Sequence, residues 1–224
     1  MLLNQFFKKL NMKRKSLSVT KKTLNFYLTK LKDPQVRKLY NLFSNNLASM
    51  DLTNKKIMVG VSGGADSLAV LFFSQCYALK HHTKLYPVII DHKLRKESTI
   101  EAKNLKYKLK QNFKINCKIL SKKIVKINKN IQSYARDLRY DLFFEECNKQ
   151  KIDYLILGHH KDDLIENFFI RFLRGSGLKG LVSFDKNVII YNGINVIRPF
   201  LSTSKKDLFK INKKTFGFFI DDPT

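Results

Sequence analysis

The chain of 224 residues carries 43 lysine and arginine side chains against 18 aspartate and glutamate side chains, a formal net charge of +25. Its longest apolar run is far shorter than the roughly 20 residues that a membrane-spanning helix needs, so the sequence predicts no membrane span. Its three scattered cysteines form no CxxC pair, which argues against a disulfide framework and against a structural zinc site.

The positive charge favours a polyanionic partner. A net charge of +25 raises encounter rates with nucleic acid more than it serves a small acidic substrate. Composition offers a second explanation, because the chain is rich in Lys, Asn, Ile and Phe, as the proteins of AT-rich genomes are. Residues 1–32 contain no acidic side chain and form a predicted basic arm. Such an arm suits either an RNA-contacting segment or an organelle transit peptide.

The predicted elements alternate between strands and helices from residue 33 onward. Asp33-Pro34 predicts a helix start, because proline fits the first helical position. Apolar runs predict strands at Lys56–Val61, Leu85–Ile90, Ile115–Leu120 and Asp153–Leu157. Helical spacing predicts helices at Asp66 to about Leu79, Glu97 to about Asn112, Asn130 to about Asn148 and Asp162 to Leu173. Strands separated by such helices predict an α/β fold, an open parallel sheet with helices on both faces.

The pattern changes after the last of these helices. Val188–Tyr191 and Ile194–Ile197 flank Asn192-Gly193, the signature of a type I′ hairpin, and a helix is expected from Ser204 to about Phe216. The final residues 221–224 do not resemble the end of a helix or strand.

Three regions follow from these patterns. We expect a basic N-terminal arm at 1–32, an α/β domain at 33–185, and a small hairpin-plus-helix extension at 186–224 that begins a longer C-terminal region.

The glycine turn after the first predicted strand predicts an anion site. In Val61-Ser62-Gly63-Gly64-Ala65-Asp66-Ser67 the strand leads through two glycines to a helix N-terminus, whose free N–H groups bind phosphate. The glycines let the backbone approach phosphate oxygens closely, and Ser62 and Ser67 add hydroxyl donors. This turn follows neither the Walker A nor the GxGxxG pattern. Asp66 would repel phosphate unless Mg²⁺ lay between them, so we interpret it as a metal ligand, with a plain helix N-cap as the alternative.

The turn SGGxDS at a strand-to-helix junction resembles the PP-loop of the N-type ATP pyrophosphatases, which have a Rossmann-like fold and split ATP between its α and β phosphates. Four further segments follow in the order found in tRNA(Ile)-lysidine synthases. They are DHxLRxES from Asp91, ARxxRYxxF from Ala135, HHxDDxxE from His159, and RGSGLxGL from Arg174. The resemblance extends from about Ile57 to Leu201.

This resemblance implies a ligase that uses ATP and Mg²⁺. The family adenylates the 2-carbonyl oxygen of the wobble cytidine in a tRNA(Ile) with a CAU anticodon, and L-lysine then displaces AMP to form lysidine. It also implies a cytoplasmic enzyme, unless the basic arm directs it to an organelle. The oligomeric state is left open.

The resemblance further assigns roles to residues of this chain. For ATP binding it implies Ser62, Gly63, Gly64, Ala65, Asp66, Ser67, Asp91 and His92. For lysine or tRNA it implies Arg136, Arg139, His159, His160, Asp163, Glu166, Arg174 and Gly175. The catalytic set is Asp66, Arg139, Asp163 and Glu166, and the metal ligands are Asp66 and Asp162.

Several of these residues have structural alternatives. Asp162 or Asp163 suits a helix N-cap, Asp91 a capped strand end, and Gly175 a helix C-cap. Glu166 could pair with a surface lysine, and a role of either histidine in proton transfer is left open.

Three other functions compete with the lysidine reaction. A 2-thiocytidine-type tRNA enzyme would need CxxC pairs, which the chain lacks. A PP-loop enzyme for a small molecule would leave the net charge of +25 unexplained. A non-catalytic RNA-binding relic would retain the charge and the fold without turnover.

Overall fold

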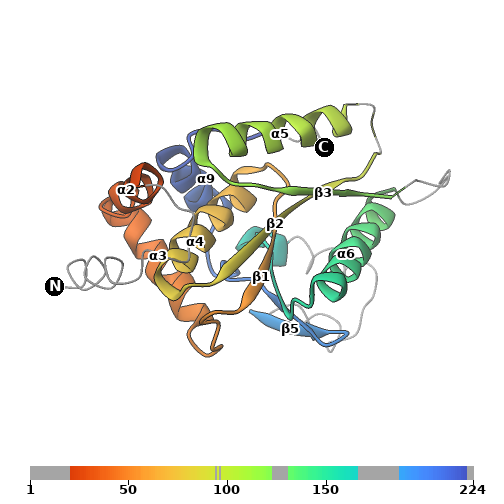
Figure 1. The fold of residues 1–224 in the computed structure, drawn as a ribbon, viewed down its shortest axis with the longest axis horizontal. Coiled ribbons are helices and arrows are strands. Elements are labelled where there is room, and N and C mark those ends of the chain that lie inside the picture. Colours follow the sequence, from red (N-terminus) through yellow and green to blue (C-terminus); the bar gives the residue numbers. More distant parts are fainter. Residues whose placement is uncertain (1–20, 94, 96, 123–130, 166–186, 221–224) are drawn as a thin grey trace.

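The computed structural model describes residues 21–93, 95, 97–122, 131–165 and 187–220, which form one sheet with helices packed around it (Figure 1). The strands are β1 Lys56–Gly60, β2 Lys84–Asp91, β3 Lys118–Ser121, β4 Tyr154–Ile156, β5 Val188–Tyr191 and β6 Ile194–Ile197. Their order across the sheet is β3-β2-β1-β4-β6-β5. Neighbours are parallel except β5, which pairs antiparallel with β6. The expected parallel sheet is confirmed.

Helices cover both faces of this sheet. They are α2 Lys21–Lys30, α3 Pro34–Leu47, α4 Ala65–His81, α5 Ser98–Phe113, α6 Ile131–Gln150 and α9 Lys205–Lys214. Alternate residues of β1 enter different cores. Ile57 belongs to the core that side chains of α2, α3, α4, α5 and α9 share, whereas Met58 belongs to the core that includes side chains of α6. This alternation follows from the two-residue period of a strand. Both faces of β1 are apolar, as expected of a central parallel strand.

The N-terminal segment contributes to the larger core. In α2, Tyr27 and Leu28 are buried, and Leu31 just after the helix is buried as well. The arm predicted at 1–32 therefore contains a helix that packs on the domain from residue 21 onward, because its apolar residues recur at helical spacing between the lysines. Residues 1–20 lie outside the described part of the chain.

The C-terminal segment completes the sheet. Strand β6 pairs in parallel with β4 and provides it with a second neighbour, and α9 packs on α4. Asn192 and Gly193 both have positive φ angles, 48° and 78°, as a type I′ turn requires. The hairpin and helix of the predicted extension are thus integral to the α/β sheet.

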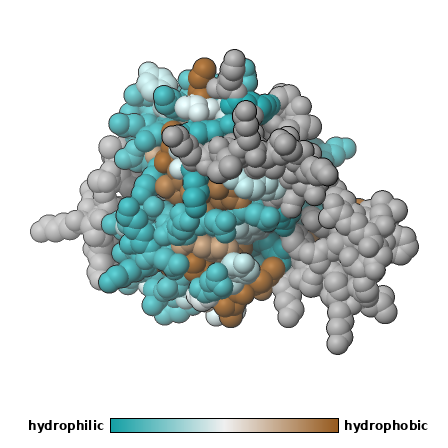
Figure 2. Space-filling view, turned by 90° about the vertical axis from the view of Figure 1, so that its right-hand side faces the viewer, coloured by the Kyte–Doolittle hydropathy of each residue, from teal (hydrophilic) through white to brown (hydrophobic). Residues whose placement is uncertain are grey.

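The described surface is mostly hydrophilic on the side seen in Figure 2. Over all the described residues, the large apolar side chains that are exposed are Ile100, Tyr107, Ile165, Ile190 and Tyr191. Among the described helices, none combines the length and the apolar character needed to cross a bilayer.

Candidate active site

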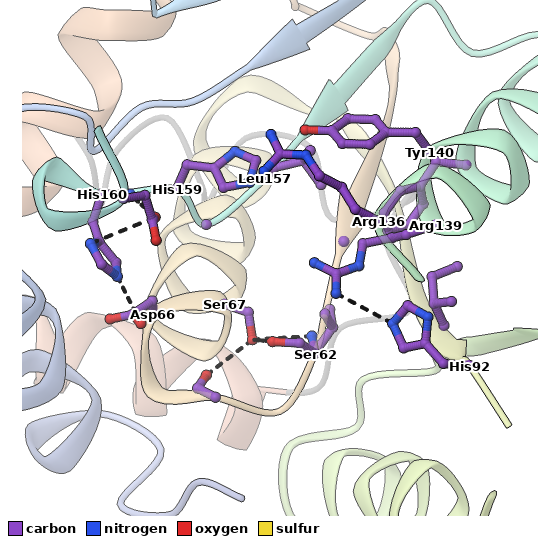
Figure 3. A pocket seen from close by; sticks show the side chains of 17 residues that line it. Ser62, Asp66, Ser67, His92, Arg136, Arg139, Tyr140, Leu157, His159 and His160 are labelled. Atoms are coloured by element: carbon purple, nitrogen blue, oxygen red, sulfur yellow. Dashed lines mark hydrogen bonds and ion pairs between the residues drawn. The ribbon is translucent and has the colours of Figure 1, made fainter. Parts of the chain in front are cut away.

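A cavity of about 200 Å³ lies at the carboxyl ends of β1 and β4. Open parallel sheets bind their ligands at this edge, because loops and helix N-termini converge there. The side chains and backbone that border it come from the glycine turn, the end of β2, helix α6 and the segment after β4 (Figure 3). Four segments far apart in the sequence therefore meet around one space.

The glycine turn is closed by a side chain of its own helix. Ser67 Oγ accepts hydrogen bonds from the backbone N–H groups of Ser62 and Gly63, each at 3.2 Å, and donates to the Gly64 carbonyl at 3.0 Å. The exposed Ser62 hydroxyl donates to the same Ser67 oxygen at 3.0 Å. In this arrangement Ser67 shapes the turn, and its hydroxyl proton is already engaged within it.

Asp66 lies in the first turn of α4 and faces the cavity. The N-cap of α4 is Gly64, with φ −63° and ψ 157°, so the alternative of Asp66 as that N-cap does not apply. One carboxylate oxygen, Oδ2, lies 3.4 Å from His160 Nε2. The other, Oδ1, is buried and has no hydrogen-bond partner among the described residues. A buried carboxylate oxygen without a partner is costly and suits a ligand or cation.

This oxygen fits a magnesium ion. Mg²⁺ in nucleotide enzymes takes one or two carboxylates, and phosphate and water oxygens supply its other ligands. Within the described ranges there is no group of three or more His, Cys, Asp or Glu side chains that could hold a metal by themselves. Asp66 would thus act together with a bound phosphate.

His160 lies between Asp66 and two acids that follow it closely in the sequence, Asp162 and Asp163. The backbone N–H of His160 donates to Asp163 Oδ2 at 2.8 Å, a reach-back contact typical of a helix start. Its Nδ1 lies 3.6 Å from Asp163 Oδ2 and 3.9 Å from Asp162 Oδ2. Asp162 also accepts the backbone N–H of Lys205 at 2.9 Å, which ties it to the start of α9. Asp66 and Asp162 therefore face different nitrogens of the His160 ring.

The two adjacent histidines have opposite electrostatic surroundings. Burial and then the charges of Arg136, Arg198 and Arg139 lower the pKa of His159 to about 3. Burial would also lower the pKa of His160, but the hydrogen bond to Asp66 and the nearby carboxylates outweigh it and raise that pKa. His159 is therefore neutral near pH 7, whereas the positive form of His160 is favoured.

Helix α6 forms the opposite side of the cavity. Arg136 and Arg139, three residues apart, both border the space, and Figure 3 shows them across from Asp66 and His160. Arg139 Nη2 lies 3.4 Å from His92 Nε2, and the Arg136 guanidinium lies 5.8 Å from the ring centroid of Tyr140. We call Arg136 and Arg139 the basic wall, and Asp66 and Asp163, which flank His160, the acidic wall.

Comparison with known proteins agrees with this geometry. A family model described as the PP-loop domain matches residues 31–224. The chain belongs to the PP-loop domain family.

Two curated relatives of this PP-loop chain are tRNA(Ile)-lysidine synthases. The tRNA(Ile)-lysidine synthase of Orientia tsutsugamushi (strain Boryong) is 40% identical over 171 residues, which cover 76% of this chain and 38% of that protein. The tRNA(Ile)-lysidine synthase of Wolbachia pipientis wMel is 37% identical over 173 residues, which cover 77% of this chain and 40% of that protein. The chain thus matches about two fifths of the length of these relatives.

The fold also occurs in solved structures. The U34-tRNA thiolase NcsA from Methanococcus maripaludis superposes with a TM-score of 0.71 at 19% identity, over 86% of this chain and 67% of that one. At this identity the likeness concerns the fold alone.

Not every residue that the motifs predicted for the site borders the cavity. Both carboxylate oxygens of Asp91 are engaged: Oδ1 accepts from the Lys93 N–H at 3.0 Å and the Ser98 hydroxyl at 3.2 Å, and Oδ2 from the Thr99 hydroxyl at 2.7 Å. Asp91 therefore organises the turn that leads to α5, while its neighbour His92 borders the cavity. Ala65 and Gly63 are buried beside the space. Glu166, Arg174 and Gly175 lie outside the described residues.

Gly158 also borders the cavity, although the motif HHxDDxxE begins only at the next residue. A Cβ at Gly158 would lie 3.0 Å from Ser67 Cα and 3.1 Å from Ser67 N, so only glycine lets the end of β4 touch the start of α4. Its position directly before His159-His160 in the sequence was the available signal. Tyr140, next to Arg139 in the sequence, is a further addition and borders the same space.

Proposed function

We propose that this PP-loop chain attaches L-lysine to the wobble cytidine of a tRNA(Ile) with a CAU anticodon, at the expense of ATP. The observation that carries the proposal is the meeting of the glycine turn, the acidic wall and the basic wall around one cavity. The identity of 40% to a lysidine synthase over the segment that builds this cavity supports the choice of substrates.

The phosphates of ATP would lie against the glycine turn and the N-terminus of α4. Backbone N–H groups at a helix N-terminus favour an anion, and the helix dipole adds to that attraction. Asp66 would hold Mg²⁺ through its unpartnered Oδ1, and the ion would neutralise charge on the phosphates. His160 keeps the other oxygen of Asp66 in place.

The two walls suit a substrate that carries both charges. Lysine has a carboxylate, which the guanidinium forks of Arg136 or Arg139 can bind, and an ammonium group, which Asp163 can attract. The predicted partner of Asp163, Glu166, lies three residues further along the chain. His159, neutral between arginines, would donate or accept a hydrogen bond without adding charge.

The proposed reaction has two steps. The 2-carbonyl oxygen of the cytidine attacks the α-phosphorus of ATP, the bond from that phosphorus to the bridging oxygen of the β-phosphate breaks, and pyrophosphate leaves. The lysine amine then attacks C2, the bond from C2 to the adenylated oxygen breaks, AMP leaves, and the nitrogen loses its proton. The basic wall is placed to stabilise the negative charge on the departing phosphates.

A thiolation reaction is less consistent with the cysteines. Cys76, Cys117 and Cys147 are all buried. Burial raises the pKa of Cys117 and of Cys147 to about 12 and that of Cys76 well above its ordinary value. Because the thiolate is the reactive form, none of the three suits sulfur transfer.

The test is release of AMP and pyrophosphate from ATP by the purified chain. We expect release to need both L-lysine and a tRNA with a CAU anticodon, and Asp66→Ala to abolish it. Asp207→Ala is the matched control, since Asp207 is an exposed acid in the first turn of another helix.

Other outcomes separate the alternatives. Equal release with glutamine or sulfide in place of lysine would contradict the proposal. A gel shift of the tRNA without any AMP release would favour the RNA-binding relic. We place the reaction in the cytoplasm, and a transit-peptide role for the basic arm at residues 1–32 stays a prediction.

A further inference from the structure

A segment far from the glycine turn in sequence holds one of its peptide groups. The backbone N–H of Ile220 donates to the carbonyl of Gly63 at 3.0 Å. The Ile220 side chain packs on the same glycine, since a Cβ at Gly63 would lie 3.1 Å from Ile220 Cδ1 and 3.1 Å from Leu105 Cδ2. The turn therefore contacts the last described residue of the chain.

Two helices anchor this segment. Asn212 of α9 is fully buried, and its Nδ2 donates to the carbonyl of Phe218 at 2.8 Å. The Phe218 ring stacks on Phe113 of α5 at 6.0 Å with an interplanar angle of 17°, and the Phe219 ring packs edge-on against Phe209 of α9 at 5.1 Å. Residues 218–220 are therefore fixed on α5 and α9 before they reach the turn.

We propose that residues 218–220, held by Asn212, are a positioning element that sets the orientation of the Gly63–Gly64 peptide for phosphate binding. The inference rests on the proposed nucleotide site. In a trans peptide the C=O and the next N–H point in opposite directions. Because Ile220 holds the Gly63 carbonyl on its side, the Gly64 N–H is directed the opposite way. Gly64 borders the cavity, whereas Gly63 does not.

The need for the hydrogen bond from Ile220 to Gly63, which we call the lock, follows from the two glycines. A peptide between glycines rotates at little cost, because neither residue has a Cβ to restrict it. Rotation by half a turn would direct the Gly63 carbonyl oxygen where a donor is wanted, and that oxygen would repel a phosphate. Ser67 holds the preceding peptide through the Gly63 N–H. Ile220 holds the following one, so each peptide of the turn has its own partner.

Ile220→Pro tests the lock, because proline has no N–H to donate. Ile220→Val is the matched control, since it keeps the donor and trims one methylene. Isothermal titration of the purified chain with Mg·ATP, inorganic pyrophosphate and AMP measures the effect. We expect Ile220→Pro to lower the affinity for ATP and for pyrophosphate about tenfold, as loss of one hydrogen bond does. The affinity for AMP should stay within about twofold of the wild-type value. Ile220→Val should bind all three as the wild type does.

A second variant guards against a folding defect. Asn212→Leu keeps a similar volume and removes the donor to Phe218, and we expect a smaller loss of pyrophosphate affinity, again without a loss for AMP. Thermal unfolding is recorded for every variant.

Three results would overturn the inference. Wild-type affinity of Ile220→Pro for pyrophosphate would show that the lock is not needed. Equal losses for ATP and AMP with a lowered Tm would show a structural role only. Failure of the wild-type chain to bind any of the three probes would remove the proposed nucleotide site itself.

Discussion

Replacement of Gly158 by alanine should destabilise the contact between β4 and α4 on which the cavity depends. The new Cβ would lie 3.0 Å from Ser67 Cα, 3.1 Å from Ser67 N and 3.2 Å from the Asp66 carbonyl carbon, all of them backbone atoms. Backbone cannot rotate away as a side-chain tip does, so the strand end and the helix start must separate by a few tenths of an ångström. Overpacking of this kind costs about 1–3 kcal/mol of unfolding free energy.

The measurement is urea unfolding together with thermal unfolding. For a domain of this size a loss of about 2 kcal/mol lowers Tm by roughly 4–8 °C. Gly64→Ala is the control for stability, because the nearest atom to its new Cβ is Ser62 Oγ at 3.7 Å, an ordinary contact. We expect Gly64→Ala to change unfolding by less than about 0.5 kcal/mol while it weakens pyrophosphate binding, since its methyl group would enter the phosphate site. Equal stability of Gly158→Ala and the wild type would refute the argument from close approach.

Three further predictions follow from single contacts. Ser67→Ala should cost about 1–3 kcal/mol of unfolding free energy, because it leaves the Ser62 and Gly63 N–H groups without their acceptor. Replacement of the exposed Ser62 by alanine should leave the unfolding free energy nearly unchanged. Similar losses for the two variants in urea unfolding would contradict this. The hydrogen bond from Lys214, together with the backbone N–H donors of α3, lowers the pKa of Asp33. The ionised carboxylate therefore stabilises the fold above its unfolded pKa near 4. That stabilisation is lost as the pH falls through the lower folded pKa. Asp33→Asn, which keeps the cap, should therefore show a shallower loss of stability below about pH 4 in urea unfolding, and an unchanged slope would exclude this contribution. Nuclear magnetic resonance titration should find the midpoint of His159 at about pH 3, and a midpoint near the ordinary value would contradict the effect of burial and the arginines.

Local patterns in the sequence were sufficient for most elements. The hairpin strands Val188–Tyr191 and Ile194–Ile197 have the predicted bounds, and Asp33 caps the helix that begins at Pro34. Boundaries differ most at β3, which begins at Lys118 and not at Ile115, because the backbone N–H of Ile115 donates to the Leu109 carbonyl at the end of α5. These features depend on turn chemistry and residue period, which act over a few residues.

The cavity was only partly predictable. The motifs identified the glycine turn, Arg136, Arg139 and the acids after β4, because each stands where a strand ends or a helix begins. For Asp91 they left a nucleotide contact and a capped strand end as alternatives. They could not decide between these, since the partners of Asp91 are hydroxyls and an N–H group that no charge pattern reveals. They also treated His159 and His160 alike.

The sequence by itself determined that this is an α/β chain with an anion-binding turn, because a strand, two glycines and a helix start are contiguous. The resemblance of SGGxDS to the PP-loop then implied that the anion is ATP. Only the tertiary structure decided which distant groups meet there. His160 reaches Asp66, and Ile220 reaches Gly63, across 94 and 157 residues of sequence. Such contacts depend on the order of the strands, with β4 between β1 and β6, and local periodicity carries no information about that order. The opposite pKa shifts of two adjacent histidines have the same origin, because burial and neighbouring charges come from other elements of the fold.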